Sequence, residues 1–207
     1  MENNYNNCTV AGTITEVTNG ITYLSITRKS GKEDMVKVKI PDNYAIGDTI
    51  IVRGKIKTES YYDTDNVRHL RTFIEGNGIY TFTDDQNTIR FEGYLCKEPI
   101  LRVTPKGQRI VDYCIAVQDG GQSYYIYCIT FGDATKLITS LNIGDKIHLK
   151  GCLQSRDYIK NGQPRTCNEV VGYDIHKVIM EAKDGNQEWS IKIKETRYAK
   201  SRDYAKV

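Results

Sequence analysis

The most informative side chains in the sequence are cations and tyrosines that alternate with apolar residues. In residues 145–158, Ile147, Leu149, Gly151 and Leu153 alternate with a second set that includes Lys150 and continues in Arg156 and Tyr158. Residues 48–61 show the same pattern and also end in tyrosine. Because side chains alternate between the two faces of a β-strand, each polar set lies on one face and each apolar set on the other. Exposed rings stack on bases while neighbouring cations neutralise phosphates, so this combination indicates binding to a single-stranded nucleic acid.

The overall composition is compatible with such a face. The chain has 207 residues, of which 39% are hydrophobic and 27% charged, enough for one mid-sized domain or two small ones. Tyrosine is unusually common, with 15 residues against 4 Phe and 1 Trp, and it suits surfaces that are both flat and wet. The net charge is only +3, so a nucleic-acid site requires that the basic groups gather on one face.

The two stretches belong to a unit that occurs twice in the chain. Residues 46–61 align without gaps on residues 143–158, and six of the 16 positions are identical. The identical positions include the Ile-Gly-Asp that opens each stretch, a glycine in mid-strand and the closing tyrosine. Chance similarity between two strand-rich segments would reproduce the alternation but not these shared positions, so the repeat predicts two copies of one fold.

Period-2 alternation, interrupted by Gly- and Asn-containing turns, predicts five strands in each unit. The predicted strands are residues 9–16, 22–28, 35–40, 48–61 and 72–82, then 88–97, 108–118, 124–131, 145–158 and 169–178, with one helix at 134–141. Five strands with a glycine bend, and a helix between the third and fourth strands, describe the OB-fold. A jelly roll or an immunoglobulin-like sandwich would need more strands per unit.

We therefore expect an all-β protein of two tandem OB-fold five-stranded Greek-key barrels. The expected domains are a diverged first barrel in residues 1–86, a second barrel in residues 87–180, and a C-terminal extension in residues 181–207.

The second unit carries several ordered motifs. It opens with Phe91-Glu92-Gly93-Tyr94-Leu95, its third strand ends in Phe131-Gly132, and its fourth strand contains Gly151-Cys152-Leu153-Gln154-Ser155-Arg156-Asp157-Tyr158. In these motifs, residues 88–178 resemble the bacterial and phage single-stranded DNA-binding protein family. The resemblance implies that Tyr125, Phe131 and Tyr158 stack on bases and that Tyr127 shares their outer face. The first unit resembles the family only through the internal repeat.

The candidate nucleic-acid-binding residues follow from the strand faces and from this resemblance. In the second unit they are Tyr125, Tyr127, Phe131, Tyr158, Lys150, Arg156, Arg102, Lys106 and Arg165. In the first unit they are Lys37, Lys39, Arg53, Lys55, Lys57 and Tyr61. Other roles are open for the same residues: strand cations also solubilise an edge, tyrosines pack at barrel ends, and Phe131 could be buried against a second subunit.

Enzymatic and metal chemistry find little support in the sequence. There is no P-loop and no G-x-S-x-G, and the three histidines have no ligand spacing; His148 and Cys152 share a strand face, but two ligands do not make a zinc site. We expect no catalytic residue, cofactor or metal.

The six cysteines lack a C-x-x-C pair, so we expect reduced thiols. The sequence shows no apolar stretch of about 18 residues and no signal-peptide pattern, so we expect a cytoplasmic protein with no membrane contact.

The C-terminal extension departs from the family, whose members end in an acidic, Phe-ended tip that recruits replication and repair proteins. Residues 181–207 are of mixed charge and end in Asp203-Tyr204-Ala205-Lys206-Val207, so binding to replication or recombination proteins is open. They could extend the nucleic-acid path or form a short strand or helix around Trp189. Because the family usually works with four OB units, a homodimer is expected, with a monomer as the alternative.

The expected function is that of a single-stranded DNA-binding protein that coats its ligand without sequence preference in replication, recombination or the maintenance of a mobile element. The alternative is an OB-fold adaptor or inhibitor of replication machinery that does not rely on DNA. RNA binding is a third possibility, because stacking does not distinguish the two sugars.

Overall fold

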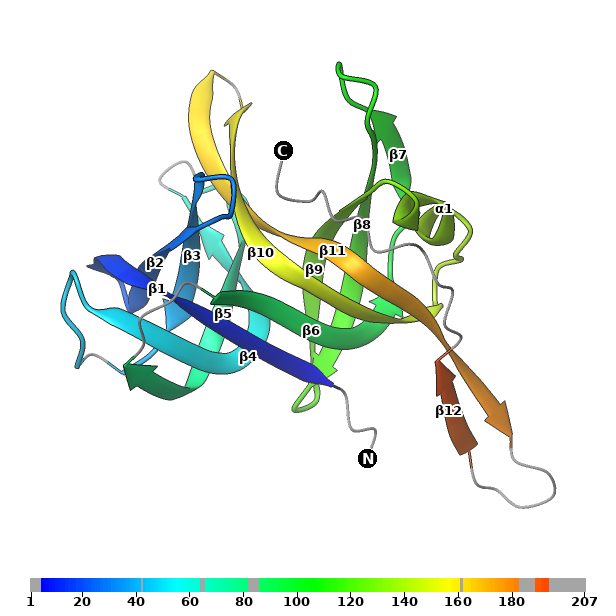
Figure 1. Cartoon of the computed structure of the whole chain (residues 1–207), viewed down its shortest axis with the longest axis horizontal. Helices are drawn as coiled ribbons and strands as arrows, with labels where there is room; N and C mark the ends of the chain where they lie inside the picture. The colour runs from blue at the N-terminus through cyan, green and yellow to red at the C-terminus, as the bar shows by residue number, and fades with distance from the viewer. Residues whose placement is uncertain are drawn as a thin grey trace.

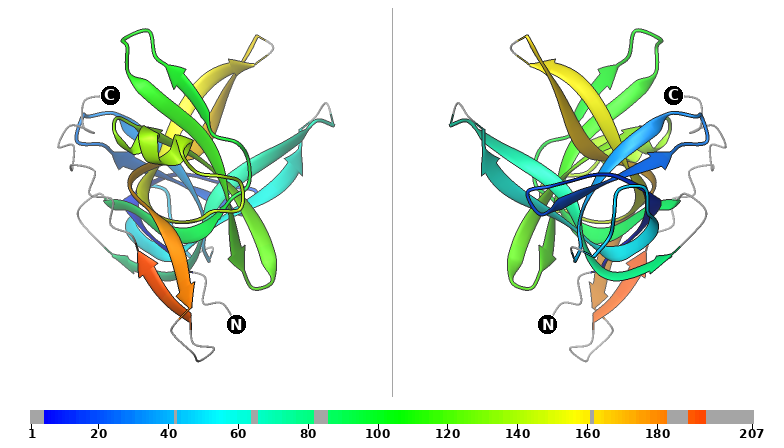
Figure 2. Two further views of the ribbon diagram at one scale, coloured as in Figure 1. Left: turned by 90° about the vertical axis from the view of Figure 1, so that its right-hand side faces the viewer. Right: turned by 90° about the vertical axis from the view of Figure 1, so that its left-hand side faces the viewer.

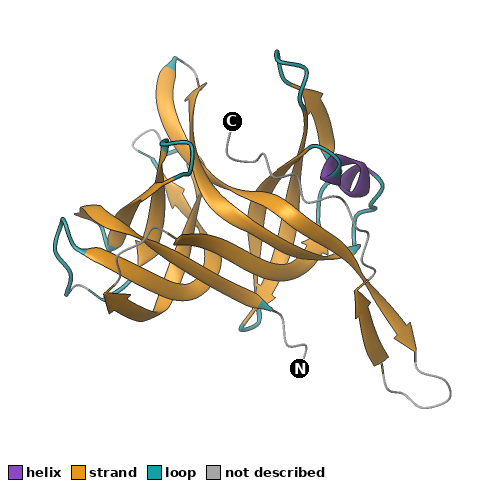
Figure 3. Ribbon diagram, in the orientation of Figure 1, coloured by secondary structure: helices purple, strands orange, loops and turns teal. Residues whose placement is uncertain are grey.

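The computed structural model describes residues 5–41, 43–63, 66–81, 86–160, 162–182 and 189–193. Within these ranges the chain forms twelve strands and one short helix (Figure 3). The strands pair into one continuous sheet that curls into two closed barrels lying side by side (Figure 1). The predicted all-β, tandem OB-fold class is confirmed.

The first barrel closes through five strands. They are β1 (Asn6–Thr18), β2 (Ile21–Thr27), β3 (Glu33–Lys39), β4 (Thr49–Tyr62) and β5 (Arg68–Thr81). Strand β1 pairs with β2, β2 with β3, β3 with β5, β5 with β4, and β4 with β1 again. Only the β3–β5 pair is parallel, which is the topology of a five-stranded Greek-key barrel.

The second barrel repeats this order and adds further elements. Its elements are β6 (Gln86–Leu95), β7 (Ile100–Val103), β8 (Arg109–Asp119), β9 (Gln122–Phe131), α1 (Ala134–Thr139), β10 (Lys146–Lys160), β11 (Gln163–Ala182) and β12 (Trp189–Ile193). Strands β6, β8, β9, β11 and β10 close the barrel, with β9 and β11 parallel. The sequence did not predict β7, which forms a hairpin with β8. The strand expected as one possibility around Trp189 is β12, which pairs with the end of β11.

Strands β1 and β6 join the barrels in an antiparallel pair (Figure 1). In this pair Cys8 lies opposite Ile89, while Asn6 lies opposite Phe91 and Val10 opposite Asn87. The repeat makes Ile89 the counterpart of Cys8 and Asn87 the counterpart of Asn6, so the register is symmetric about its centre. The contact is that of an isologous dimer within a single chain.

The repeated glycines explain how each barrel bends. A Cβ atom built at Gly54 would lie 2.0 Å from the carbonyl oxygen of Glu75, and one at Gly151 would lie 2.3 Å from that of Val171. Both glycines follow a register shift between the two long strands. Only a residue without a side chain lets the strands approach this closely, which confirms the expected glycine bend.

The repeated Ile-Gly-Asp forms the same turn in each barrel. In the first barrel the N–H of Gly47 donates to the carbonyl of Ile14 over 2.8 Å, and the N–H of Ile14 donates to the carbonyl of Asp48 over 2.9 Å. The second barrel forms the same two bonds at Leu95, with the same lengths. The glycine has a φ of 95° in the first turn and 93° at Gly144, in a region that favours glycine.

An asparagine at the start of each barrel fastens the long fourth strand. The side chain of Asn6 donates to the carbonyl of Ile56 and accepts from its N–H, both over 3.0 Å. Asn87 does the same with Leu153, over 2.6 and 2.8 Å. The fourth strands and the strands that follow them continue as hairpins beyond the barrels (Figure 2), β4–β5 in cyan and β10–β11 in yellow.

Candidate nucleic-acid interface

A groove of about 660 Å³ lies between the first barrel and the outer face of the second. Its floor is apolar and belongs to the second barrel. Ile110, Ile129 and Val171 are 4–6% exposed there, and Phe131 and Cys152 pack against them. These side chains lie outside the barrel, in a cluster separate from the main core. The floor therefore offers an apolar surface with a half-buried aromatic ring to a ligand from outside.

Both barrels contribute to the walls of this groove. The first barrel supplies the end of β2, the β2–β3 loop and the start of β3, and the second supplies parts of β6, β7, the β7–β8 loop, β10 and β11. The lining residues outside the floor are Ile26, Thr27, Arg28, Lys29, Ser30, Lys32, Asp34, Gln86, Asn87, Arg102, Thr104, Gln108, Gln154, Ser155, Arg156, Glu169 and Tyr173.

Two of the predicted cations, Arg102 and Arg156, stand at the groove and are held in place by carboxylates. Arg156 forms two hydrogen bonds with Glu169, over 3.0 and 3.3 Å, and this carboxylate raises the arginine's pKa. Arg102 pairs in the same way with Asp112. A guanidinium has five N–H donors and a bidentate carboxylate uses two, so each arginine keeps donors for a phosphate.

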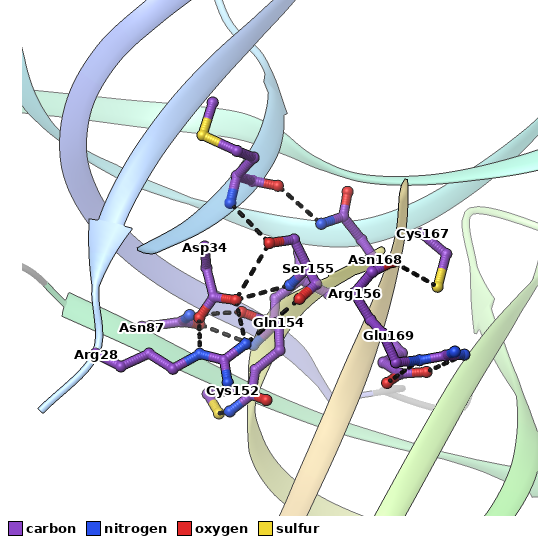
Figure 4. Close-up of polar contacts among 12 residues, drawn as sticks. Arg28, Asp34, Asn87, Cys152, Gln154, Ser155, Arg156, Cys167, Asn168 and Glu169 are labelled. Atoms are coloured by element: carbon purple, nitrogen blue, oxygen red, sulfur yellow. Dashed lines mark hydrogen bonds and ion pairs between the residues drawn. The ribbon is translucent and has the colours of Figure 1, made fainter. Parts of the chain in front are cut away.

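A polar network fixes the first barrel against the second at one side of the groove (Figure 4). Asp34, which is 1% exposed, accepts hydrogen bonds from Arg28 over 2.7 and 2.6 Å and from the backbone N–H of Ser155 over 2.8 Å. The hydroxyl of Ser155 accepts from the N–H of Met35 over 3.0 Å, and Asn168 donates to the carbonyl of Met35 over 2.8 Å. Arg28 and Asp34 therefore link the first barrel to β10, and the Asn168–Met35 hydrogen bond links β3 to β11.

The three candidate aromatics of β9 share one strand face but not one pocket. Tyr125 and Tyr127 are 48% and 46% exposed, and Phe131 alone lines the groove. The hydroxyl of Tyr127 accepts a hydrogen bond from Lys97 over 3.1 Å, and the backbone N–H of Tyr125 donates to Thr58 of the first barrel over 3.2 Å. Tyr125 and Tyr127 therefore lie on the same strand face as Phe131 but outside the groove.

Tyr158 and two further candidates of the second barrel, Lys150 and Lys106, lie outside the groove lining. Tyr158 is half-buried, with the guanidinium of Arg156 5.8 Å from its ring centre, and Lys150 lies 5.9 Å from the ring of Tyr173. Lys106 is exposed in the β7–β8 loop.

Arg165 is turned toward the first barrel instead of toward the groove. It contacts Asp63 over 3.4 Å and His69 over 3.2 Å, and these two residues are themselves 2.6 Å apart. Arg165 therefore joins the β4–β5 and β10–β11 hairpins.

Three candidate lysines of the first barrel are neutralised within the chain. Each has a carboxylate 2.5 Å from its Nζ: Lys39 with Glu59, Lys55 with Asp119, and Lys57 with Glu75. Asp119 also lies 3.8 Å from Lys57, and it comes from the second barrel. Burial opposes ionisation of Glu59, but Lys39 and Arg71 outweigh it and lower the pKa of this carboxyl. Nucleic-acid phosphates would have to compete with these carboxylates.

The remaining candidates of the first barrel also have neighbours. Tyr61 stacks on His69 with ring centres 5.3 Å apart, and Arg71 lies 5.2 Å from its centre on the same ring. Lys37 is half-buried, and burial, aided by Arg71, lowers its pKa. Arg53 is exposed on β4.

The two outer faces therefore differ although the barrels are copies. The β-ladders make Cys152 the counterpart of Lys55, Ile129 the counterpart of Lys39, and Val171 the counterpart of Glu75. Apolar floor residues in the second barrel thus correspond to ion-paired residues in the first. This difference explains why the groove lies over the second barrel.

Residues 86–178 match the model of the single-strand binding protein family. The second barrel is therefore similar to the domains of this family. Two solved structures of the single-stranded DNA binding protein from Thermus aquaticus resemble the whole chain. A deletion variant superposes with a TM-score of 0.70 and 18% identity over 90% of this chain and 100% of that one. The wild-type protein gives 0.68 and 18% over 88% and 97%. No curated protein matches the sequence.

The structure adds residues that the sequence did not single out. The floor residues Ile110, Ile129 and Val171 look like core residues in the sequence. They stand in continuous apolar runs, in which the sequence does not show which residues face into the barrel and which face outward. Lys29 and Lys32 stand in a segment that the sequence marks only as a turn. Their position beside the second barrel results from tertiary packing, for which no sequence signal exists.

The described residues contain no group of three or more His, Cys, Asp and Glu side chains arranged to hold a metal ion. His148 lies 3.2 Å from Glu92, and Cys152 belongs to the groove floor. None of the helices in that part of the chain has the length and apolarity to span a membrane. Of the C-terminal extension, residues 181–207, which could extend the nucleic-acid path, residues 183–188 and 194–207 lie outside the described residues.

Proposed function

We propose that this chain binds single-stranded DNA without sequence preference and that bases stack on the floor of the groove, around Phe131. The observation that carries the proposal is the apolar floor with an accessible ring, flanked by Arg102 and Arg156. Stacking on an aromatic ring tolerates every base, and arginines with spare donors suit a phosphate backbone. The family match of the second barrel supports the same ligand.

An adaptor function is the second candidate, because the apolar floor could also hold a side chain of a protein partner. The arginines favour nucleic acid, since the centre of a protein-binding patch is usually poor in charge. Binding to DNA and to RNA would rest on the same stacking contacts, so only the 2′-hydroxyl distinguishes them.

Fluorescence anisotropy with labelled oligo-dT at two salt concentrations tests the proposal, with duplex DNA and oligo-U as competitors. We expect tight binding to the single strand that weakens steeply with salt. Phe131→Ala should weaken binding by about 5- to 140-fold, which corresponds to the ~1–3 kcal/mol of one stacked base. Tyr62→Ala is the control, because Tyr62 is an exposed ring on the β4–β5 hairpin, outside the groove.

Three outcomes would contradict the proposal: no binding at low salt, equal affinity for duplex DNA, or equal losses in both variants. The first of them would favour the adaptor. Tight binding to oligo-U would assign RNA as the ligand.

We further propose that the protein acts in the cytoplasm, in replication, recombination or the maintenance of a mobile element. We also propose that residues 1–86 form the first barrel domain, residues 87–180 the second, and residues 181–207 an extension. Two chains would associate to bring four barrels together. Light scattering coupled to gel filtration tests the association, since a mass of one chain at micromolar concentration would exclude the dimer.

A further inference from the structure

The wall of the groove that the first barrel supplies carries two unengaged cations. Lys29 and Lys32, in the β2–β3 loop, line the groove and are exposed. Within the described part of the chain, neither side chain takes part in an ion pair or a hydrogen bond. In this respect they differ from Lys39, Lys55 and Lys57 of the same barrel, which are all neutralised.

The loop that carries these lysines is held in a defined position. Its turn is closed by hydrogen bonds from the N–H of Arg28 to the carbonyl of Lys32 over 2.8 Å and from the N–H of Gly31 to the carbonyl of Arg28 over 2.9 Å. Asp34 accepts a hydrogen bond from the backbone N–H of Ser155 in the second barrel and two hydrogen bonds from the guanidinium of Arg28, and so holds the loop against β10. Arg28 and Asp34 are therefore positioning residues, and the two lysines are the groups presented to a ligand.

We propose that the first barrel supplies the phosphate-binding wall of the second barrel's groove, so that a single strand bound there contacts both barrels at once. Its bases would lie on the floor around Phe131, and its phosphates would lie against Lys29 and Lys32. A polynucleotide carries bases along one edge and phosphates along the other, and the groove has an apolar floor and a cationic wall in the same arrangement. This inference rests on the proposed function.

The decisive variant is Lys29→Ala/Lys32→Ala in the full chain. Loss of two phosphate contacts should reduce the slope of log affinity against log salt by about 1.4, because each contact to a single strand contributes about 0.7. At about 0.1 M salt this equals a loss of about 25-fold in affinity. The charge-retaining variant Lys29→Arg/Lys32→Arg should keep the wild-type slope.

Lys136→Ala/Lys177→Ala is the control for net charge. It removes the same net charge from positions outside the groove, on α1 and on β11, where the lysines pair with Asp133 and Asp145. Its slope should equal that of the wild type. Equal slopes for this control and for Lys29→Ala/Lys32→Ala would overturn the inference, because the lysines would then act only through the overall charge.

A short oligonucleotide shows whether Phe131 and the two lysines bind the same nucleotides in one groove or whether the lysines bind DNA at a separate site. Oligo-dT of about four nucleotides, the lower end of an OB-fold's site size, should lose affinity in both Phe131→Ala and Lys29→Ala/Lys32→Ala. If the lysine variant affects only long strands, the lysines bind DNA elsewhere and the shared groove is refuted. If the wild type binds no single strand, the proposed function itself fails.

Discussion

Asp119→Asn should increase the affinity of the protein for single-stranded DNA. This carboxylate stands at the end of β8 in the second barrel and lies 2.5 Å from the Nζ of Lys55 and 3.8 Å from that of Lys57. The substitution leaves Lys55 without its partner, whereas Lys57 keeps Glu75. Lys55, which the sequence predicts to bind phosphate, would then be available to a phosphate of the DNA.

The expected size follows from counterion release. One additional phosphate contact steepens the slope of log affinity against log salt by about 0.7, equal to about fivefold tighter binding at about 0.1 M salt. The loss of fold stability should be only about 0.2–1 kcal/mol, because Lys55 is 42% exposed and the pair is screened by solvent. Salt titrations with labelled oligo-dT measure the first quantity, and urea unfolding measures the second.

A double-mutant cycle with Lys55→Ala tests the cause. In the wild type, Lys55→Ala should change affinity little, since its charge is already neutralised; in the Asp119→Asn background it should abolish the gain. Asp133→Asn is the control, because it removes the same charge from an exposed carboxylate at α1. If Asp133→Asn tightens binding equally, or if Lys55→Ala has the same effect in both backgrounds, pairing with Asp119 does not mask Lys55 and the reasoning is wrong.

Three further predictions concern stability, each measured by urea unfolding. Asn87→Ala removes both hydrogen bonds to the backbone of β10 and should cost about 1–3 kcal/mol. Gly151→Ala places a Cβ 2.3 Å from the carbonyl oxygen of Val171, so the strands must separate at a cost of about 1–3 kcal/mol. The hydrogen bond from Lys177 lowers the pKa of Asp145, so the ionised carboxylate stabilises the fold above its unfolded-state pKa, and this contribution is lost as the pH falls through the folded-state pKa. Asp145→Asn should therefore cost about 0.5–1 kcal/mol at about pH 7 and progressively less as the pH falls below the ordinary range of an aspartate pKa. A change below about 0.5 kcal/mol for Asn87→Ala or Gly151→Ala, or a pH-independent cost for Asp145→Asn, would contradict the geometry.

The sequence predicted the barrels well because their determinants are local and repeated. Strand alternation, the Ile-Gly-Asp turn and the mid-strand glycine each act over a few residues, and each appears twice. Strand β7 was missed because Ile100–Val103 is short and exposed on both faces, so it shows no alternation. The predicted strand 145–158 covers nearly all of β10, but the predicted strand 169–178 is too short, because β11 begins at Gln163 and ends at Ala182.

The candidate site was only partly predictable. The strand pattern and the family resemblance led to Phe131, Arg102 and Arg156, which the structure brings together at one groove. The pattern could not show that the lysines of β3 and β4 meet carboxylates, because their partners lie 18 to 64 residues away in sequence. A cation on an outer strand face is visible in a sequence, but whether it is available to a ligand depends on tertiary contacts.

The symmetric pairing of β1 with β6 has a consequence for how the two halves can evolve. In an association of identical subunits, every substitution appears on both sides of the axis, and the contact dissociates on dilution. Here the link between the halves is covalent, so the strand pairing persists at any protein concentration. Each half is also free to change alone, so one can keep an apolar platform while the other becomes its charged support.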